Sequence, residues 1–112
     1  MRPLRLTRRM ALEELSRQPD GAGGYGESWA ALGVLWAEVV ARTGRERAVG
    51  PASVSDVPYR ITVRAAAPGA PSRPRPDQRL REGTRLFRIV AVTERDAAGH
   101  FLTCFAHEEA AA

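Results

Sequence analysis

The sequence predicts an all-β fold, a small antiparallel β-barrel with long loops, on three observations. Residues 59–65 alternate apolar and polar side chains with the two-residue period of a half-buried strand. Residues 86–93 form an apolar run typical of a central strand, and residues 96–99 after it suit a tight hairpin turn. A length of 112 residues leaves room for one domain, spanning residues 1–112, with a single core.

The first half of the chain contains one expected strand and one ambiguous segment. Alternating leucines at its start predict a strand over residues 4–14. Residues 16–28 hold a Pro-Asp-Gly turn and four glycines, so we expect a flexible loop there. In residues 29–41, apolar side chains fall both at helical spacing and on one face of a strand. Periodicity alone slightly favours a helix for this segment.

The second half of the chain is expected to hold three strands, at residues 59–66, 85–95 and 100–107. Two long loops join the expected strands. The segment 43–58 is polar, and the segment 66–76 contains four prolines and has no apolar period. The last residues, 108–112, are expected to fray.

The composition is that of a soluble globular domain. Hydrophobic residues make up 44% of the chain and charged residues 27%, which argues against disorder. The longest apolar stretch, residues 29–41, is too short and interrupted to cross a membrane, and no signal-peptide core follows the basic N-terminus. With Cys104 as the single cysteine, no disulfide forms within the chain, which suits a reducing cytoplasm.

The positive charge is carried by arginine alone. All 17 basic side chains are Arg, which indicates coding bias in a GC-rich genome, since phosphate binding would also use Lys. The net charge of +4 is unevenly spread, because residues 1–17 and 60–88 are basic whereas residues 18–59 and 89–112 are acidic. Such alternation suits contacts between copies of one protein as well as DNA binding.

No motif in the chain predicts catalysis, a cofactor or a metal site. Residues 21–26 match the G-x-G-x-x-G nucleotide fingerprint, but no apolar strand precedes them, as that mechanism requires. His100 and Cys104 share one expected strand, where their Cα atoms would lie about 13 Å apart, too far for a catalytic pair. Two histidines and one cysteine without close spacing make no zinc site. We therefore expect Cys104 in the core and a protein that is not an enzyme.

The aromatic and basic side chains leave two interpretations open. Trp29 and Trp36 lie in the most apolar segment and are expected in the core or in a subunit interface, although Trp beside Arg also suits single-stranded nucleic acid. The three phenylalanines, Phe87, Phe101 and Phe105, are expected in the core of the hairpin. Six arginines form either a solvated face or a contact surface for another subunit or ring: Arg60, Arg64, Arg73, Arg75, Arg79 and Arg81.

The order of landmarks along the chain resembles one protein family. Its most specific parts are Trp-Ala-Glu-Val at residues 36–39, Tyr-Arg-Ile-Thr-Val-Arg at residues 59–64, and the later series Arg79-Leu80, Gly83 and Phe87-Arg88-Ile89. A Gly-rich loop before Trp29 and a final hairpin extend the series over almost the whole chain. This order resembles the phage head–tail joining family (head-closure, or stopper, proteins) of tailed phages with long non-contractile tails and of gene transfer agents.

The resemblance implies a structural, non-enzymatic role. Members of that family are small β-barrels that form a six- or twelve-fold homo-oligomeric ring and close the DNA exit channel. Portal and adaptor proteins lie above the ring, and the tail terminator or tail tube lies below it. For this chain the resemblance implies that residues 29–41 are a strand. It also implies non-specific contact with packaged double-stranded DNA, a place at the head–tail interface of the particle, and assembly in the bacterial cytoplasm without a membrane or cofactor.

Two loops are the candidates for function in such a ring. The polar loop 43–58 contains glycines that allow it to swing, so we expect it to line or close the channel; its candidate residues are Gly44, Arg45, Glu46, Arg47 and Gly50. The loop 66–76 is semi-rigid because proline restricts φ, and we expect it to reach a neighbouring subunit or ring. The alternative function is a small barrel that binds single-stranded nucleic acid through Trp and Arg.

Overall fold

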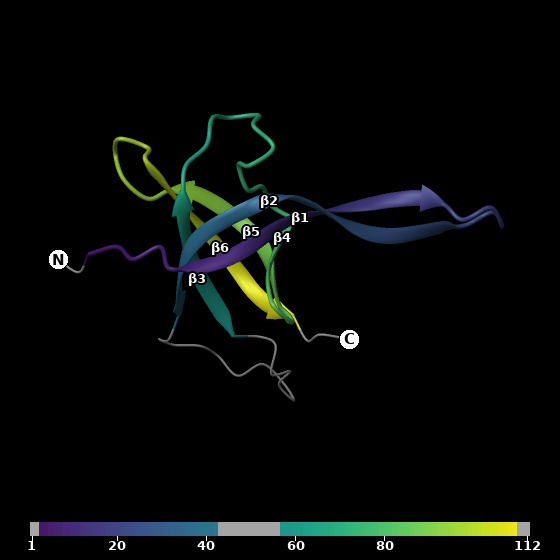
Figure 1. Ribbon diagram of the computed structural model, residues 1–112, viewed down its shortest axis with the longest axis horizontal. Coiled ribbons are helices and arrows are strands. Elements are labelled where there is room, and N and C mark those ends of the chain that lie inside the picture. Colours follow the sequence, from purple (N-terminus) through teal and green to yellow (C-terminus); the bar gives the residue numbers. More distant parts are fainter. Residues whose placement is uncertain (1–2, 43–56, 110–112) are drawn as a thin grey trace.

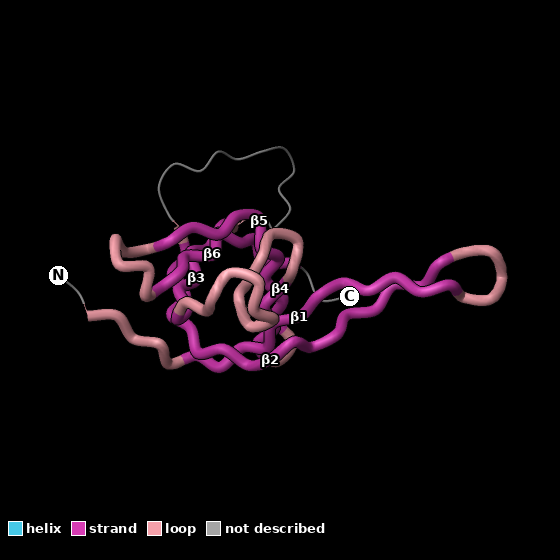
Figure 2. Tube along the Cα trace, turned by 90° about the horizontal axis from the view of Figure 1, so that it is seen from above, coloured by secondary structure: helices cyan, strands magenta, loops and turns pink. Residues whose placement is uncertain are grey.

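A computed structural model describes residues 3–42 and 57–109, and every element in these residues is a β-strand. The six strands are β1 (Arg8–Pro19), β2 (Tyr25–Ala41), β3 (Pro58–Arg64), β4 (Arg79–Glu82), β5 (Arg85–Glu94) and β6 (Phe101–Glu109). All neighbours are antiparallel, in the order β1-β2-β3-β6-β5-β4, and β4 returns to pair with β1. The sheet therefore closes on itself (Figures 1 and 2), which confirms the predicted small all-β barrel.

Side chains that face the inside of the closed sheet form one core. On β3, Ile61 and Val63 are fully buried while Arg60 and Arg64 are exposed, as the alternation predicts. The buried apolar residues are Met10, Leu12, Ala37, Ile61, Val63, Leu80, Phe87, Ile89, Leu102, Cys104 and Ala106. The predicted burial of Cys104 and Phe87 is confirmed.

Two of the three phenylalanines are not in this core. Phe101 and Phe105 are only half-buried, because on β6 they alternate with the inward-facing Leu102, Cys104 and Ala106. The prediction that they lie in the core is wrong. Their rings instead lie beneath arginines of the outer surface, Arg64 over Phe101 at 5.5 Å and Arg42 over Phe105 at 5.8 Å.

β4 is the strand that closes the sheet, and the sequence analysis assigned no strand there. It pairs with β5 along its whole length and with β1 only at Ala11–Glu13. Only Leu80 of its four residues is apolar and fully buried. A strand this short and this polar carries no period-2 signal in the sequence, so tertiary pairing defines it.

β1 and β2 continue beyond the barrel as a two-stranded ribbon, residues 14–30, which we call the arm. Among the strands of the described residues, β1 beyond Glu13 pairs with β2 alone, up to Pro19 opposite Tyr25. Figure 1 shows the arm projecting from one side of the barrel along the long axis of the molecule, which extends 56 Å. At its tip the Asp20 carboxylate accepts hydrogen bonds from the backbone N–H groups of Ala22 and Gly24, which lower its pKa.

The arm corrects the expectation of a flexible loop at residues 16–28. Residues 16–19 and 25–28 are paired strand, and the turn itself spans only residues 20–24. The glycines that indicated a loop lie mainly in this turn, where Gly21 and Gly23 adopt positive φ.

A β-bulge marks the base of the arm. Leu12 lies opposite Gly33, but the next residue, Glu13, lies opposite Ala31, so Leu32 is an extra residue in β2. Since side chains alternate along a strand, one extra residue moves every later side chain of β2 to the other face. Odd-numbered residues of β2 such as Leu35 and Ala37 face the core, whereas Trp29 faces outward beside the partners of Glu13.

The remaining segment predictions have mixed outcomes. Residues 29–41 are a strand, as the resemblance implied, so the helical period was misleading there. The expected strand 4–14 begins at Arg8 and continues to Pro19. The tail expected to fray at 108–112 is paired as far as Glu109, because Phe87 lies opposite Glu108 and Leu86 opposite Glu109. Most of the predicted loop 43–58, residues 43–56, lies outside the described residues.

The hairpin between β5 and β6 follows the prediction for residues 96–99. Gly99 has a φ of 71° and its N–H donates to the Asp96 carbonyl at 3.0 Å. The Asp96 carboxylate accepts from the N–H groups of Phe101 and His100, which lowers its pKa. This turn needs a residue that tolerates the left-handed region, which explains the glycine.

Replacing Phe87 by Ala is expected to lower the free energy of unfolding by about 3–5 kcal/mol, because a fully buried ring leaves a cavity. The loss includes the edge contact with Tyr59, whose ring centroid lies 5.2 Å away. Urea titration measures it. Val90→Ala is the matched control on the same strand, since Val90 is 52% exposed, and should cost under about 0.5 kcal/mol. Equal losses for the two variants would contradict the assigned core.

Candidate interaction surfaces

A carboxylate on the outer surface joins β1 to β4. Glu13 is 5% exposed, and its two oxygens accept separate hydrogen bonds at 2.7 Å from Arg79 Nε and Arg81 Nε. Arg79 lies directly opposite Glu13 in the register, and Arg81 lies two residues further along β4. One carboxylate therefore connects two arginines of the closing strand to β1.

This pairing changes the protonation of Glu13. Burial acts to raise the pKa of the carboxyl group, but the hydrogen bonds from Arg81 and Arg79, with the attraction of their charges, outweigh it and lower the pKa overall. Glu13 is thus ionised at neutral pH although it is buried. A buried charge with two cationic donors is a contact whose loss leaves both arginines uncompensated.

Trp29 is covered by the same cluster. The Arg79 guanidinium lies 4.1 Å from the centroid of the Trp29 ring, and the Arg88 guanidinium lies 5.2 Å from it. Trp29 is half-buried at the outer surface, which corrects the expectation of a place in the core. Because guanidinium groups occupy its surface, the ring is not an open platform for a nucleic-acid base.

Two further arginine–carboxylate pairs join strands near the start of β3. Arg8 on β1 binds Glu82 on β4, with Nε 2.9 Å from Oε2. Arg85 on β5 binds both oxygens of Glu108 on β6, at 2.8 and 3.0 Å, and Tyr59 on β3 donates its hydroxyl to Glu108. The hydrogen bonds from the arginines lower the pKa values of Glu82 and Glu108.

Contacts within the chain hold the proline-rich loop 66–76. Arg73 Nη1 donates to the Ala66 carbonyl at 2.8 Å, and Pro74 is fully buried. Arg75 forms an ion pair with Glu14 at the base of the arm, and its N–H donates to the Gln78 side chain at 2.8 Å. The loop is therefore fixed against the barrel, consistent with the expected semi-rigid character.

Arg60 and Arg64 differ from the other four candidate arginines. Both point outward from β3, and neither side chain forms an ion pair or a hydrogen bond within residues 3–42 and 57–109, whereas each of the other four forms at least one. Arg60 lines a polar pocket of about 490 Å³ over β2, β3, β5 and β6, together with Glu38, Thr62 and Thr103. Arg64 lines a separate pocket of about 390 Å³ with Leu6, Val34, Leu35 and Trp36, which we call the Trp36 pocket.

Trp36 is exposed, which corrects the prediction that it packs in the core. It is 54% exposed, and Val34 on the same face of β2 is 46% exposed. Their neighbours Leu35 and Ala37 take the inward positions. Tyr25 at the end of the arm is exposed still further, at 72%. These three side chains form the largest apolar features of the surface of β2.

The structure thus separates the residues proposed from the sequence. Arg79 and Arg81 meet at Glu13, Arg73 and Arg75 stabilise the loop 66–76, and Arg60 and Arg64 face outward on β3. The channel candidates lie outside the described residues: Gly44, Arg45, Glu46, Arg47 and Gly50. Sequence reasoning missed Glu13, Tyr25 and the stacking of Trp29. The sequence contains a signal for Tyr25 alone, because an aromatic side chain stands out in a glycine-rich, polar segment.

Nothing among the described residues assembles a reactive centre. Cys104 faces the core, while the exposed His100 lies in the turn with its Nδ1 3.8 Å from Asp96. In residues 3–42 and 57–109, no three His, Cys, Asp or Glu side chains gather to bind a metal ion. No helix able to cross a membrane occurs in the same residues.

Glu13→Gln is expected to lower stability by about 2 kcal/mol at pH 7, because it removes a charged acceptor from two hydrogen bonds. Since folding lowers the pKa of Glu13, the carboxylate stabilises the protein at pH values above 4.5, the ordinary pKa of this group. This contribution is lost as the pH falls through the pKa of the folded state. The free energies of unfolding of the unchanged protein and of Glu13→Gln, measured by urea titration from pH 7 to pH 3, should therefore converge. Glu27→Gln, which breaks the exposed pair with Arg17, is the control. A difference independent of pH would refute the ionised Glu13.

Cys104 should be unreactive in the folded protein. Burial raises the pKa of its thiol to about 12, so the thiolate is scarce at neutral pH and inaccessible to reagents. A chromogenic disulfide reagent at pH 8 is expected to label one thiol only after denaturant is added. Rapid labelling of the native chain would show that the β3–β6–β5 core opens.

Two solved structures contain chains that are similar to this one. This chain is 56% identical to a chain from the "Virion of native gene transfer agent (GTA) particle", with a TM-score of 0.79, over 99% of this chain and 100% of that one. It is also similar to protein SF1141 from Shigella flexneri 2a, with 22% identity, a TM-score of 0.68 and 98% of both chains covered, a likeness of fold alone. No curated protein sequence matches the chain.

The profile of one family, described as phage head completion protein, matches residues 1–109. This match spans nearly the whole chain and confirms the resemblance noted in the sequence. The chain therefore belongs to the phage head completion protein family, whose members are structural, non-enzymatic components of the virion.

Proposed function

We propose that this protein forms a homo-oligomeric ring that joins the portal and adaptor of a phage-like or gene transfer agent particle to its tail and closes the DNA exit channel. Family membership and the similarity to a chain of a gene transfer agent virion support a place in the particle. The main support for the ring is the arm, a long projection that no other strand of the described residues covers.

The arm is built for a contact that one chain does not supply. Its outer residues on both strands are exposed, and within residues 3–42 and 57–109 the two strands pair there only with each other. A two-stranded ribbon without a covering layer is marginally stable in water, so it gains order by packing on another surface. A projection on one side that binds a different surface of the next copy makes a heterologous contact, and such contacts generate a ring when the rotation closes.

Two loops leave the barrel at opposite ends of β3. The loop 43–58 enters β3 at Pro58, and the loop 66–76 follows its other end at Arg64. The two segments therefore join β3 at its opposite ends, which suits a ring with unlike neighbours above and below. We assign 43–58, with Gly44, Arg45, Glu46, Arg47 and Gly50, to the channel. We assign 66–76 to a neighbouring subunit or ring.

The contacts of the described residues support this assignment. The Arg42 N–H donates to the Pro58 carbonyl at 2.9 Å, so the two residues that flank the segment 43–56 are held together. Internal hydrogen bonds and the Arg75–Glu14 ion pair hold the loop 66–76 in one shape, as a docking element requires. Arg73 and Arg75 give the loop its shape in this proposal.

In this role the contact with double-stranded DNA is weak and non-specific. A channel must let DNA pass, and closure depends on steric obstruction more than on affinity. Within residues 3–42 and 57–109, half of the arginines form ion pairs with carboxylates of the same chain, which reduces the positive charge available to phosphates. The alternative, binding of single-stranded nucleic acid, loses Trp29 as a stacking surface because Arg79 and Arg88 cover it.

Shortening the two loops separately tests the assignment. Particles carrying a chain trimmed within 43–58 should dock the ring normally but lose packaged DNA, since the obstruction is removed. Particles carrying a chain trimmed within 66–76 should fail to dock the ring or the tail. Nuclease protection of packaged DNA and electron microscopy of tails measure the two outcomes.

The purified trimmed chains provide the control, because both should unfold within a few degrees of the unchanged chain. The reverse pattern of defects would show that the loops are assigned the wrong way round. Normal DNA retention and tail attachment in particles that lack the protein altogether would refute the proposed function.

A further inference from the structure

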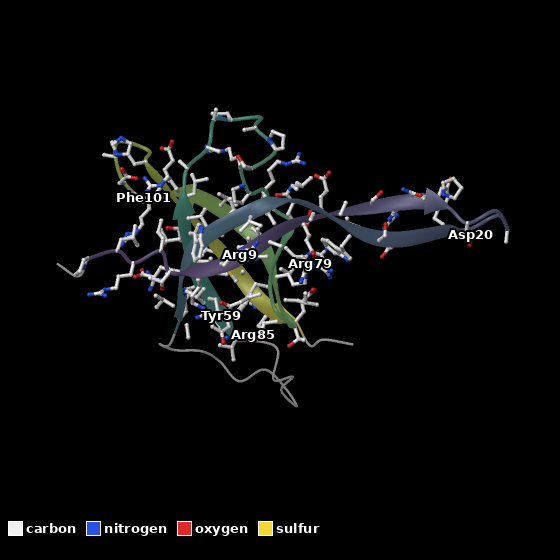
Figure 3. All side chains as sticks on the ribbon, in the orientation of Figure 1. Arg9, Asp20, Tyr59, Arg79, Arg85 and Phe101 are labelled. Carbon is white, nitrogen blue, oxygen red and sulfur yellow. The ribbon has the colours of Figure 1, made fainter. Side chains whose placement is uncertain are left out.

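The largest exposed apolar features of β2 lie at opposite sides of the molecule. Tyr25, 72% exposed, ends the arm, whereas Trp36, 54% exposed, lies on the barrel. The Trp36 pocket includes Leu6 of the N-terminal segment and Arg64, whose guanidinium stacks on Phe101. Figure 3 shows Phe101 on the side of the barrel away from the arm and Asp20 at the far tip of the arm.

Trp36 and Arg64 of this pocket belong to an ordered row of side chains across four strands. Arg9 lies opposite Trp36 in the β1–β2 register, and Arg64 lies opposite Phe101 in the β3–β6 register. Since Ala37 pairs with Val63, Trp36 and Arg64 stand at the same level. Arginine and aromatic side chains therefore alternate across the outer face of β1, β2, β3 and β6.

We propose that the Trp36 pocket binds the arm tip of a second copy of this chain, with Tyr25 packed against Trp36 and Arg64. This inference rests on the proposed ring and names the contact that would link its subunits. A tyrosine ring suits the site because Trp36 offers an exposed aromatic ring and Arg64 a cation for its π face.

Charge complementarity supports this occupant over another. Arg9 and Arg64 are exposed and form no ion pair with any described residue. At the arm tip, Arg17 and Glu27 pair with each other, which leaves the negative charge of Asp20 beside Tyr25. A tip with a net negative charge would thus meet one positive charge in the pocket, Arg64, and a second beside it, Arg9.

The reach of the arm is sufficient for this contact. From Glu13 to Pro19 the arm extends six residue steps, about 20 Å at 3.3 Å per residue, beyond the barrel. The tip and the pocket lie on different sides of one chain, so the contact is heterologous. Repeating it from copy to copy gives the head-to-tail arrangement of a ring.

A disulfide between copies provides the test. Tyr25→Cys and Trp36→Cys are introduced into one chain, and the particles that still form, fewer than those of the unchanged chain because both aromatic rings are lost, are treated with a mild oxidant. The two positions lie eleven residues apart on β2, about 35 Å, whereas a disulfide needs Cα atoms within about 7 Å. Any bond between them therefore joins two copies. We expect a ladder of covalent multimers on a non-reducing gel that collapses to monomer on reduction, with the buried Cys104 uninvolved.

Matched controls make the result specific. Each single cysteine variant, and Tyr25→Cys combined with Val90→Cys, should give no ladder; Val90 is 52% exposed and lies on β5, outside the pocket. A ladder from the Val90 pair, or dimers from Tyr25→Cys alone, would show that the arm docks elsewhere. Particles that retain DNA and carry tails but give no ladder would overturn this contact while leaving the proposed ring in place.

A second measurement uses no cysteines. Tyr25→Phe keeps the aromatic side chain and should leave the yield of tailed, DNA-filled particles unchanged. Tyr25→Ala should lower that yield about tenfold, since buried aromatic anchors dominate interfaces. Equal yields for Phe and Ala would overturn the proposal. So would tight binding of a single-stranded oligothymidine to the purified chain that Trp36→Ala abolishes, since the pocket would then serve nucleic acid.

Discussion

Closure of the barrel depends on the short pairing of β1 with β4, which we call the seam. β4 contributes four residues, and only Ala11–Glu13 of β1 pair with it, so few backbone hydrogen bonds join the first strand to the last part of the sheet. Inside the seam, Leu80 packs opposite Leu12. Outside it, Glu13 compensates two arginines that would otherwise stand on one face with like charges. A closed sheet has no edge strands, so this seam also protects the barrel from pairing with other chains.

The sequence allowed the fold class to be predicted because the second half of the chain obeys simple rules. Tyr59–Arg64 alternates, and Gly99 marks a turn that needs a positive φ. Three features escaped the same rules. β4 has one apolar residue, the arm has no buried face to create a period, and residues 29–41 cross a bulge that breaks the alternation. The extra residue at Leu32 changes which residues of β2 face inward, so the apolar residues on its two sides are not separated by two positions throughout. Their spacing therefore resembled that of a helix.

The candidate site was harder to predict, because a sequence shows which charges exist but not which charges meet. The alternating acidic and basic blocks suggested contacts between copies of the chain. Within the described residues, much of that alternation is used inside one chain: Glu13 and Glu14 bind arginines 61 to 68 positions away, and Arg8 binds Glu82. Of the six candidate arginines, Arg60 and Arg64 are left for other molecules, and only their place on the outer face of β3 distinguishes them.

The bulge at Leu32 has a consequence for how this chain can change during evolution. An inserted or deleted residue in one strand of a paired ribbon exchanges its two faces, so one such change near the base of the arm would turn Trp29 away from Arg79 and Arg88. Changes at the turn 20–24 leave the pairing below it intact. The pairing therefore tolerates a longer arm tip, built by equal additions to both strands, but no change in the number of residues between Trp29 and Leu35.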